Sequence, residues 1–534
     1  MLHIKNLRIE FDEFILIDNI SFDVVPGEVL AITGPNGCGK TSLIRAIKGE
    51  LPYEGTVFVE KGKKIAFVPQ ENPESNERVV EFILQEFPEI HRIKKLLESQ
   101  VDDPLIYANL LDEYAGMGGF ELEDRIVREL LRLGFGRQEL EKSVSDFSEG
   151  EKRLLLVTRA ILKDPDLIIL DEPTNHLDIS MIMRLEEEIL RLKKSGKAFI
   201  VISHDRTFVD KIADRTLFIE RGKAVTVRGG FSLMRAHLQN KFESDLRRAQ
   251  EISRKIRQLE QEVARRKEWS RKKESQKKFA DKVMNKGYIG RKSAKLAKRA
   301  RAVEKRVEEL IDKLKAEKPF IEKRLKMLFP YYEVAERKLL SCENLSFSYD
   351  TKDLFSDINL DLTTKDRAAI VGPNGTGKTT LLKCLIGALK PKTGQIYMNK
   401  NVNWVYLPQR IETFFQKEIL LDNFMVFGIS ETEIRTILGA AKFRREKVFQ
   451  RVDTLSKGEL TRAAIVWATL SKAEFLFMDE PTNHLDIESL EVLDVLIENF
   501  KGGMLFISHD RHFISRHARE VYYLSDKKLS RMNL

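Results

Sequence analysis

Short apolar runs recur along the chain between polar and glycine-containing segments. Runs such as Ala198–Ile202 and Phe475–Met478 have the length of a β-strand. Unbroken runs of this kind are typical of strands that are buried on both faces of a parallel sheet. They fall well short of the roughly 20 apolar residues that a membrane-spanning helix needs, so we expect no membrane domain.

A helical periodicity replaces these runs within residues 231–335. Two sets of apolar residues repeat there at spacings of four, three and four: Ile252, Ile256, Leu259 and Val263, then Val303, Val307, Leu310 and Leu314. This spacing places one apolar stripe on each of two long helices, which can pair as an antiparallel coil. The stretch 272–291 between them loses the stripe and contains two glycines, which favour a turn. A helix of about 35 residues would hold this tip roughly 50 Å away, as a rigid probe.

The rest of the chain consists of two copies of one sequence pattern. Equivalent residues lie 338 positions apart early in the two copies, as for Lys40 and Lys378, and 308 apart later, as for Asp171 and Asp479. The first copy therefore has about 30 extra residues. We place them at 86–122 as a small helical hairpin that contacts a partner; a longer surface loop is the alternative. The predicted domains are 1–230, a helical linker over 231–335, and 336–534.

Positive charge is concentrated in the linker. The net charge of the chain is +9, whereas residues 241–320 contain 27 lysines and arginines against 13 acidic residues. A solvated helix face normally mixes both signs, so this bias favours a polyanionic partner such as nucleic acid. The candidate RNA-binding residues are Lys272, Lys273, Lys277, Lys278, Arg291 and Lys292.

The three cysteines, Cys38, Cys342 and Cys384, are too few for a disulfide framework or a four-thiolate metal site. Together with an N-terminus that resembles a strand and no export signal, they indicate a reducing, cytoplasmic location. Cys38 occupies a variable position of its motif, where the second copy has Thr376, and we interpret it as a spacer and not as a redox residue.

A glycine-rich loop follows an apolar strand in each copy. The sequences are Gly-Pro-Asn-Gly-Cys-Gly-Lys-Thr over 34–41 and Gly-Pro-Asn-Gly-Thr-Gly-Lys-Thr over 372–379. Such loops wrap backbone N–H groups around phosphates, while the lysine adds charge and the threonine hydroxyl binds Mg²⁺. The predicted phosphate-binding residues are Gly34, Asn36, Gly37, Gly39, Lys40, Thr41 and Ser42, with Gly372, Asn374, Gly375, Gly377, Lys378, Thr379 and Thr380.

Acidic residues end a later apolar strand in each copy. Asp171 and Asp479 suit Mg²⁺, and the next residues, Glu172 and Glu480, can accept a proton from an attacking water. The alternative is that these carboxylates only end strands. Further candidates are His204 and His509 for the γ-phosphate, Gln70 and Gln409 for Mg²⁺ and the nucleophile, and Phe11 and Tyr349 for stacking on adenine, unless these aromatic rings belong to the core.

These residues resemble the ATP-binding cassette (ABC) superfamily, and the resemblance covers both copies. The signature of that family, Leu-Ser-Gly-Gly-Gln, is replaced here by Phe-Ser-Glu-Gly-Glu over 147–151 and Leu-Ser-Lys-Gly-Glu over 455–459. The resemblance implies two tandem ABC-type α/β nucleotide-binding domains that bind ATP and Mg²⁺ as an intramolecular cassette dimer in a monomer. It also implies that each signature completes the opposite site, so that Ser456 and Gly458 face ATP on Lys40, and Ser148 and Gly150 face ATP on Lys378.

Tandem cassettes that are joined by a basic helical pair and carry Asn-His-Leu-Asp after each catalytic glutamate resemble the ABC-F family of translation proteins. Membership would imply binding to the exit site of the 70S ribosome, through 23S rRNA and the P-site tRNA, with no membrane or DNA partner. The degenerate signatures and the long linker resemble the members that dislodge antibiotics from the peptidyl-transferase centre. The alternatives are a housekeeping or stress translation factor and, more remotely, the ATPase component of a transporter.

Overall fold

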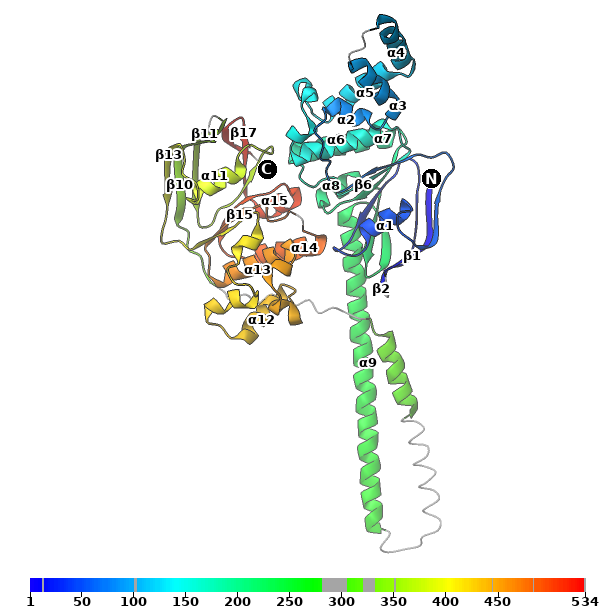
Figure 1. The fold of residues 1–534 in the computed structure, drawn as a ribbon. Helices are drawn as coiled ribbons and strands as arrows, with labels where there is room; N and C mark the ends of the chain where they lie inside the picture. Colours follow the sequence, from blue (N-terminus) through cyan, green and yellow to red (C-terminus); the bar gives the residue numbers. More distant parts are fainter. Residues whose placement is uncertain are drawn as a thin grey trace. The chain divides into compact units, whose positions relative to one another are not determined.

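The computed structural model describes residues 1–11, 14–99, 103–280, 305–319, 332–349, 352–443, 445–483 and 485–532. The chain divides into two compact units (Figure 1). One unit, Met1–Met234 with Leu325–Leu534, contains both cassettes, and the other, Arg235–Arg324, contains most of the linker. The domain boundaries expected at 230/231 and 335/336 stay a prediction.

The first cassette contains two sheets. A three-stranded antiparallel sheet has the order β2-β1-β4, and a six-stranded sheet has the order β5-β6-β7-β3-β8-β9. Strands β3, β6 and β7 are buried along their whole length, as expected for apolar strands with helices on both faces. The strands are β1 (Leu2–Phe11), β2 (Phe14–Val24), β3 (Val29–Thr33), β4 (Glu54–Val59), β5 (Ile65–Val68), β6 (Leu167–Asp171), β7 (Ala198–Ile202), β8 (Arg215–Glu220) and β9 (Lys223–Arg228).

The extra residues of the first cassette are helical. The stretch 86–122 contains α3, α4 and the start of α5, and α3 packs against α4. The hairpin interpretation of this stretch therefore agrees with the fold, although contact with a partner stays a prediction. The helices are α1 (Lys40–Ile47), α2 (Val79–Leu84), α3 (Pro88–Glu98), α4 (Pro104–Gly116), α5 (Gly119–Arg132), α6 (Glu149–Leu162), α7 (Ile179–Lys194) and α8 (Arg206–Ile212).

The second cassette repeats the two sheets, with the orders β11-β10-β13 and β14-β15-β16-β12-β17-β18. Short 3₁₀ helices over 411–427 lie between β14 and α12. The strands are β10 (Lys338–Tyr349), β11 (Lys352–Thr363), β12 (Arg367–Val371), β13 (Thr393–Met398), β14 (Trp404–Leu407), β15 (Phe475–Asp479), β16 (Gly503–Ile507), β17 (Glu520–Ser525) and β18 (Lys528–Met532). The helices are α11 (Lys378–Leu385), α12 (Glu431–Ala440), α13 (Lys457–Leu470), α14 (Ile487–Asn499) and α15 (Arg511–His517).

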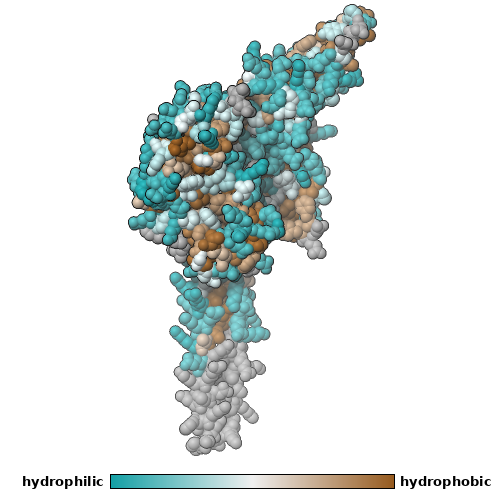
Figure 2. Space-filling model, turned by 60° about the vertical axis from the view of Figure 1, so that its left-hand side comes forward, coloured by the Kyte–Doolittle hydropathy of each residue, from teal (hydrophilic) through white to brown (hydrophobic). Residues whose placement is uncertain are grey.

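The linker contains the long helix α9 (Phe231–Ala280) and a second helical stretch over 305–317. The predicted stripes pack on each other, because Ile252 and Ile256 form a cluster with Ile311, flanked by Leu259, Val307 and Leu314. Figure 2 shows apolar atoms between hydrophilic flanks on the described part of the linker. Leu310 was wrongly expected in the stripe: it is 46% exposed, and the helical turn brings Ile311 inward in its place.

The predicted tip, 272–291, is helical at its start because α9 continues to Ala280. Lys272, Lys273, Lys277 and Lys278 thus lie on the α9 backbone, while their side chains, and Arg291 and Lys292, fall outside the described residues. Within the described part of the chain, no helix has the length and apolarity needed to cross a membrane.

Candidate active sites

Each glycine-rich loop connects the end of a buried strand to a helix that begins at the loop lysine. Lys40 Nζ donates hydrogen bonds to the carbonyl oxygens of Gly34 and Pro35, at 2.9 and 3.0 Å, and Lys378 makes the same two contacts in the second loop, each at 2.8 Å. A Cβ atom on Gly34 would lie 2.2 Å from the Ile219 carbonyl oxygen, so only glycine fits there. The loops thus have the backbone path and the buried ammonium group that phosphate binding requires.

A carboxylate and a hydroxyl meet at the ends of β6 and β15. Thr379 Oγ1 donates a hydrogen bond to Asp479 Oδ1 at 3.0 Å, and Asp479 Oδ2 is buried without a hydrogen-bond partner among the described residues. Burial raises the pKa of Asp479, and it raises the pKa of Asp171 in the first cassette, where Thr41 is the hydroxyl partner. An unpaired buried carboxylate oxygen beside a hydroxyl is an oxygen-only donor set of the kind that suits Mg²⁺.

The next residue in each cassette is a buried glutamate in a left-handed backbone conformation. Glu172 and Glu480 both have φ 50°, a strained value that persists where the surroundings impose it, most often at functional sites. Their Oε1 atoms lie 3.2 Å from Nε2 of His204 and of His509, respectively. The two cassettes therefore contain the same glutamate–histidine pair.

Burial sets the protonation of these pairs. It raises the pKa of Glu172 to about 8, against the opposing effect of Lys40, and it raises the pKa of Glu480 in the same way. Burial, and then the nearby lysine, lower the pKa of His204 to about 3 and that of His509 to about 4, so both imidazoles are neutral near pH 7. The ionised form of a glutamate with a raised pKa is a stronger proton acceptor than an ordinary carboxylate, whereas with a pKa of about 8 most of the group is protonated near pH 7.

The signature segments begin helices with a complete cap. Ser148 Oγ accepts a hydrogen bond from the Glu151 backbone N–H at 3.3 Å, and the Glu151 side chain accepts one from Ser148 N at 2.8 Å. Ser456 and Glu459 form the same capping box at α13. The glutamate that replaces the family's glutamine thus stabilises the helix start in both copies.

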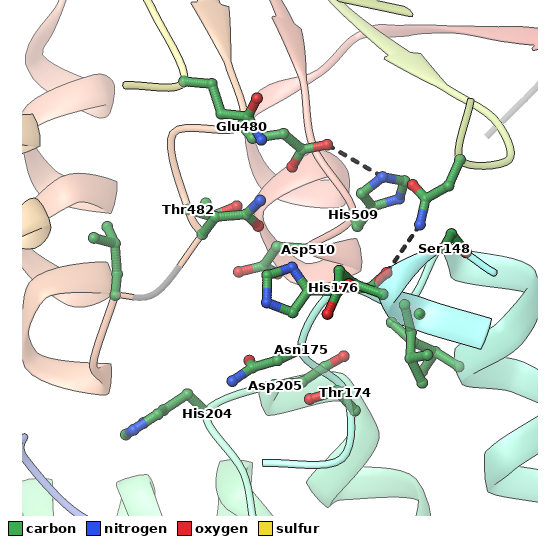
Figure 3. Close-up of a pocket in the computed structure, with 18 of the residues that line it drawn as sticks. Ser148, Thr174, Asn175, His176, His204, Asp205, Glu480, Thr482, His509 and Asp510 are labelled. Atoms are coloured by element: carbon green, nitrogen blue, oxygen red, sulfur yellow. Dashed lines mark hydrogen bonds and ion pairs between the residues drawn. The ribbon is translucent and has the colours of Figure 1, made fainter. Parts of the chain in front are cut away.

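A cavity of about 300 Å³ brings the first signature to the catalytic residues of the second cassette (Figure 3). Its lining includes Ser148, Gly150, His176, Gln409, Glu480 and His509. Gly150 is necessary at this wall because a Cβ atom there would lie 2.6 Å from the His176 carbonyl oxygen. The lining also includes Asn374 of the second glycine-rich loop and His204 of the first cassette, but not Lys378. We call the nucleotide site on Lys378, which this cavity adjoins through Asn374, the second site, and the site on Lys40 the first site.

Bonds between the cassettes also reach both glycine-rich loops. Asp178 Oδ2 accepts a hydrogen bond from Asn374 N at 3.2 Å, and Asp486 Oδ2 accepts one from Asn36 N at 3.0 Å. The Asn-His-Leu-Asp segment that follows each catalytic glutamate therefore contacts the other cassette's phosphate loop. The approach of Ser456 and Gly458 to Lys40 stays a prediction.

Comparison with known proteins assigns this geometry to a family. The family model described as ABC transporter matches residues 17–175 and 355–483. ABC transporter F family member 5 of Arabidopsis thaliana is 32% identical over 98% of this chain and 75% of its own length. The chain belongs to the ABC-F family. It is accordingly an ATPase, and its two cassettes bind ATP.

A further relative matches along nearly the whole of this chain, and a solved structure shares its fold. The ATP-binding protein YdiF of Bacillus subtilis is 32% identical over 99% of this chain and 80% of its own length. The archaeal ribosome recycling factor aABCE1, solved in complex with the archaeal ribosomal stalk protein aP1, shares the fold with a TM-score of 0.59 and 20% identity, covering 97% of this chain and 87% of that one.

The remaining candidate residues of this ABC-F protein lie at accessible positions. Gln70 and Gln409 are exposed at the ends of β5 and β14, and Gln409 lines the second site. Phe11 and Tyr349 are 46% and 52% exposed at strand ends, so neither aromatic ring is buried in the core. Their roles in binding magnesium and adenine stay predictions.

Sequence reasoning missed two sets of charged residues. Arg153 of α6 is buried under the first site. Two ion pairs also cross between the cassettes, Arg206 with Asp494 and Arg511 with Glu186. A signal for the second set was present, because both arginines follow Ser-His-Asp and their partners share the offset of 308 positions. No pattern pointed to Arg153, whose equivalent in the second copy is Thr461.

Proposed function

We propose that this ABC-F protein uses ATP to close its two cassettes and binds the ribosomal exit site through its linker. The observation that carries the proposal is the net charge of +14 over residues 241–320, in a segment that forms paired helices. Clustered lysines and arginines neutralise phosphates, which favours a groove in ribosomal RNA and tRNA. The shared fold with a ribosome recycling factor is consistent with such a partner.

The residues of each site divide the work of ATP hydrolysis. Lys40 and Lys378 bind phosphate, while Glu172 and Glu480 orient the attacking water and accept its proton. His204 and His509, neutral and bonded to these glutamates, orient them and polarise the γ-phosphate. Mg²⁺ would neutralise phosphate charge, held by Thr41, Gln70 and Asp171 in the first site and by Thr379, Gln409 and Asp479 in the second.

Closure follows from sites that are shared between the cassettes. Ser148 and Gly150 lie at the start of α6, where backbone N–H groups and the helix dipole favour an anion. ATP in the second site would be bound by both cassettes, and its γ-phosphate would hold them together. Loss of that phosphate on hydrolysis would weaken the contact and release the protein from the ribosome.

The linker charges provide the test of ribosome binding. Changing Lys272, Lys273, Lys277, Lys278, Arg291 and Lys292 to glutamine should weaken co-sedimentation with 70S ribosomes. The salt dependence should also flatten, by about one unit of slope for each lost phosphate contact. ATP affinity should not change. A control variant neutralises six exposed cassette lysines instead: Lys5, Lys61, Lys64, Lys390, Lys400 and Lys501. Equal salt slopes in the two variants would contradict the proposal.

Within this function we propose that the linker tip dislodges antibiotics from the peptidyl-transferase centre, directly or through the P-site tRNA. Phe279 lies on α9, and Met284, Tyr288 and Ile289 lie outside the described residues. Replacing residues 279–290 by a short Gly-Ser turn should abolish drug resistance in a sensitive bacterium but keep ATPase activity and most ribosome binding. Full protection by the shortened chain would contradict the tip mechanism. No protection by the parent chain would favour a housekeeping or stress translation factor.

A further inference from the structure

Arg153 joins two structural elements of the first site. The side chain is 2% exposed; one guanidinium nitrogen donates a hydrogen bond to the Pro69 carbonyl and the other to the Asp171 carbonyl. These carbonyls belong to the peptide groups that precede Gln70 and Glu172. Because a guanidinium is a rigid planar fork, it fixes the spacing of the two peptides that present these side chains to the first site.

The same helix begins in the other site. Arg153 lies about one turn after Ser148 and Gly150, which line the cavity with Glu480 and His509. Its charge also acts on that cavity, since burial, and then Arg153, lower the pKa of His176 in the lining. A displacement of the start of α6 by a γ-phosphate in the second site would therefore be transmitted through Arg153 to the first site.

The second cassette has a threonine where the first has this arginine. Thr461 Oγ1 donates a hydrogen bond to the Lys457 carbonyl of its own helix at 2.9 Å. The space between the Gln409 loop and Asp479–Glu480 is a cavity of about 300 Å³, which Thr461 lines. In the first cassette, the guanidinium of Arg153 bonds across the equivalent place.

In the second cassette, Arg462 does not make the link that Arg153 makes in the first. Arg462, one residue further along α13, donates a hydrogen bond to Ser489 Oγ on α14 at 2.6 Å. That serine lies in the first turn of α14, next to the segment that contacts the Asn36 loop. Among the described residues, no side chain of α13 bonds to the carbonyls that precede Gln409 and Glu480.

We propose that Arg153 is a positioning residue that couples the state of the second site to the catalytic geometry of the first, and that the second cassette lacks the equivalent link. Closure of the cassettes itself couples the two ATP sites. The additional coupling that we propose passes through α6 and has no counterpart in α13. Binding at either site affects binding at the other by the same factor, as linkage requires, but the rate of hydrolysis responds mainly at the first site. The proposal rests on ATP in the second site contacting α6, and it is independent of ribosome binding.

The test measures hydrolysis at the first site alone. In purified full-length chain carrying Glu480→Gln, turnover comes from the first site, and Lys378→Ala then weakens nucleotide binding at the second site. We define the loss factor as the kcat before Lys378→Ala divided by the kcat after it. This loss factor should be about 10-fold smaller in an Arg153→Thr chain than in its parent, because Arg153→Thr has already removed the link between the two sites. Arg153→Lys should give an intermediate factor, since one ammonium cannot bond in the same two-pronged way.

Arg159→Thr is the matched control, because Arg159 lies on the same helix but pairs with Glu86 and stacks on Phe82. The factor for Lys378→Ala should be unchanged in that background. Two outcomes would overturn the proposal. One is an equal kcat loss from Lys378→Ala in the Arg153→Thr chain and in its parent. The other is that Arg159→Thr reduces this kcat loss as strongly as Arg153→Thr does. Circular dichroism and the melting temperature verify that each variant is folded.

A second variant tests the link without cutting it. Thr461→Arg places a guanidinium in an existing cavity, so it does not depend on the tolerance of a buried arginine to removal. In a Glu172→Gln chain, where turnover comes from the second site, this change should increase the kcat loss caused by Lys40→Ala about 10-fold. An unchanged loss would count against the proposal, whatever the outcome with Arg153.

Discussion

In both cassettes a histidine lies 3.2 Å from a strained, buried glutamate, yet the side chains behind the two pairs differ. The first cassette supports its glutamate with Arg153, whereas the second leaves a cavity beside Thr461. The first also has the α3–α4 hairpin, within a stretch of about 30 residues that the second lacks. Most of the residues that we expect to contact ATP are thus the same in the two copies, whereas the side chains behind them differ.

The largest expected effect concerns what the two cassettes share. Glu172→Gln and Glu480→Gln should each stop hydrolysis at one site, by about 10³-fold, because the amide cannot accept the proton of water. In a single-turnover quench on chain that carries ATP at both sites, with no free ATP, each single variant should release about half the phosphate that the parent releases. Two variants with the same burst as the parent would show that these glutamates are not the proton acceptors.

The ion pairs between the cassettes give the next contrast. Arg206 and Asp494 are each 1% exposed, with Nη1 and Oδ2 2.6 Å apart, whereas Arg511 is 14% exposed and its partner Glu186 also pairs with Lys211. Arg206→Met should therefore lower the free energy of unfolding by about 2 kcal/mol, since it removes the most buried arginine partner of Asp494 and leaves that carboxylate with His517 and the more exposed Arg516. Arg511→Met should cost about 1 kcal/mol. Denaturant titration of the two variants measures this difference, and equal losses would remove the contrast.

A smaller effect depends on pH. Asp494 is buried, but its bonds to His517 and Arg206 hold its pKa below the ordinary value of 3.8. A lowered folded-state pKa gives stability that is complete above the unfolded value and is lost as pH falls through the folded value. The stability difference between the parent and Asp494→Asn should therefore be constant from pH 7 to about 5 and shrink by about 1 kcal/mol below pH 4. A difference that grew on acidification would have the wrong sign.

The smallest effect concerns adenine. Phe11→Ala and Tyr349→Ala should each weaken ATP binding at one site by about 1 kcal/mol, through loss of stacking. Tyr349 also packs edge-on against Phe347, with ring centroids 4.9 Å apart, so the second cassette has a neighbouring ring that reduces its loss. Titration with a fluorescent ATP analogue measures both. A larger loss for Tyr349→Ala would reverse the ranking.

Local motifs predicted which residues lie close to one another, because a glycine loop or an Asp-Glu strand end carries its own geometry; their roles in binding and hydrolysing ATP stay predictions. Lys40, Thr41, Asp171 and Glu172 lie together for that reason. Arg153 could not be predicted, since its partners are backbone carbonyls 84 and 18 positions away along the chain, which leave no mark in the sequence.

The linker shows the same limit. Its stripe was predicted from spacing, but the choice between Leu310 and Ile311 depends on the rotation of the helix against its partner. A repeat at spacings of four, three and four is compatible with neighbouring registers, and only packing selects one of them.

Ribosome co-sedimentation of the Glu172→Gln, Glu480→Gln double variant tests the central claim most directly. If two bound ATP molecules close the cassettes and closure permits ribosome binding, the double variant with ATP should pellet with ribosomes and remain bound. The parent with ATP should be released as hydrolysis proceeds, and both chains should stay in the supernatant without nucleotide. A double variant that pellets no better than the parent, or equally well without ATP, would contradict the link between closure and ribosome binding.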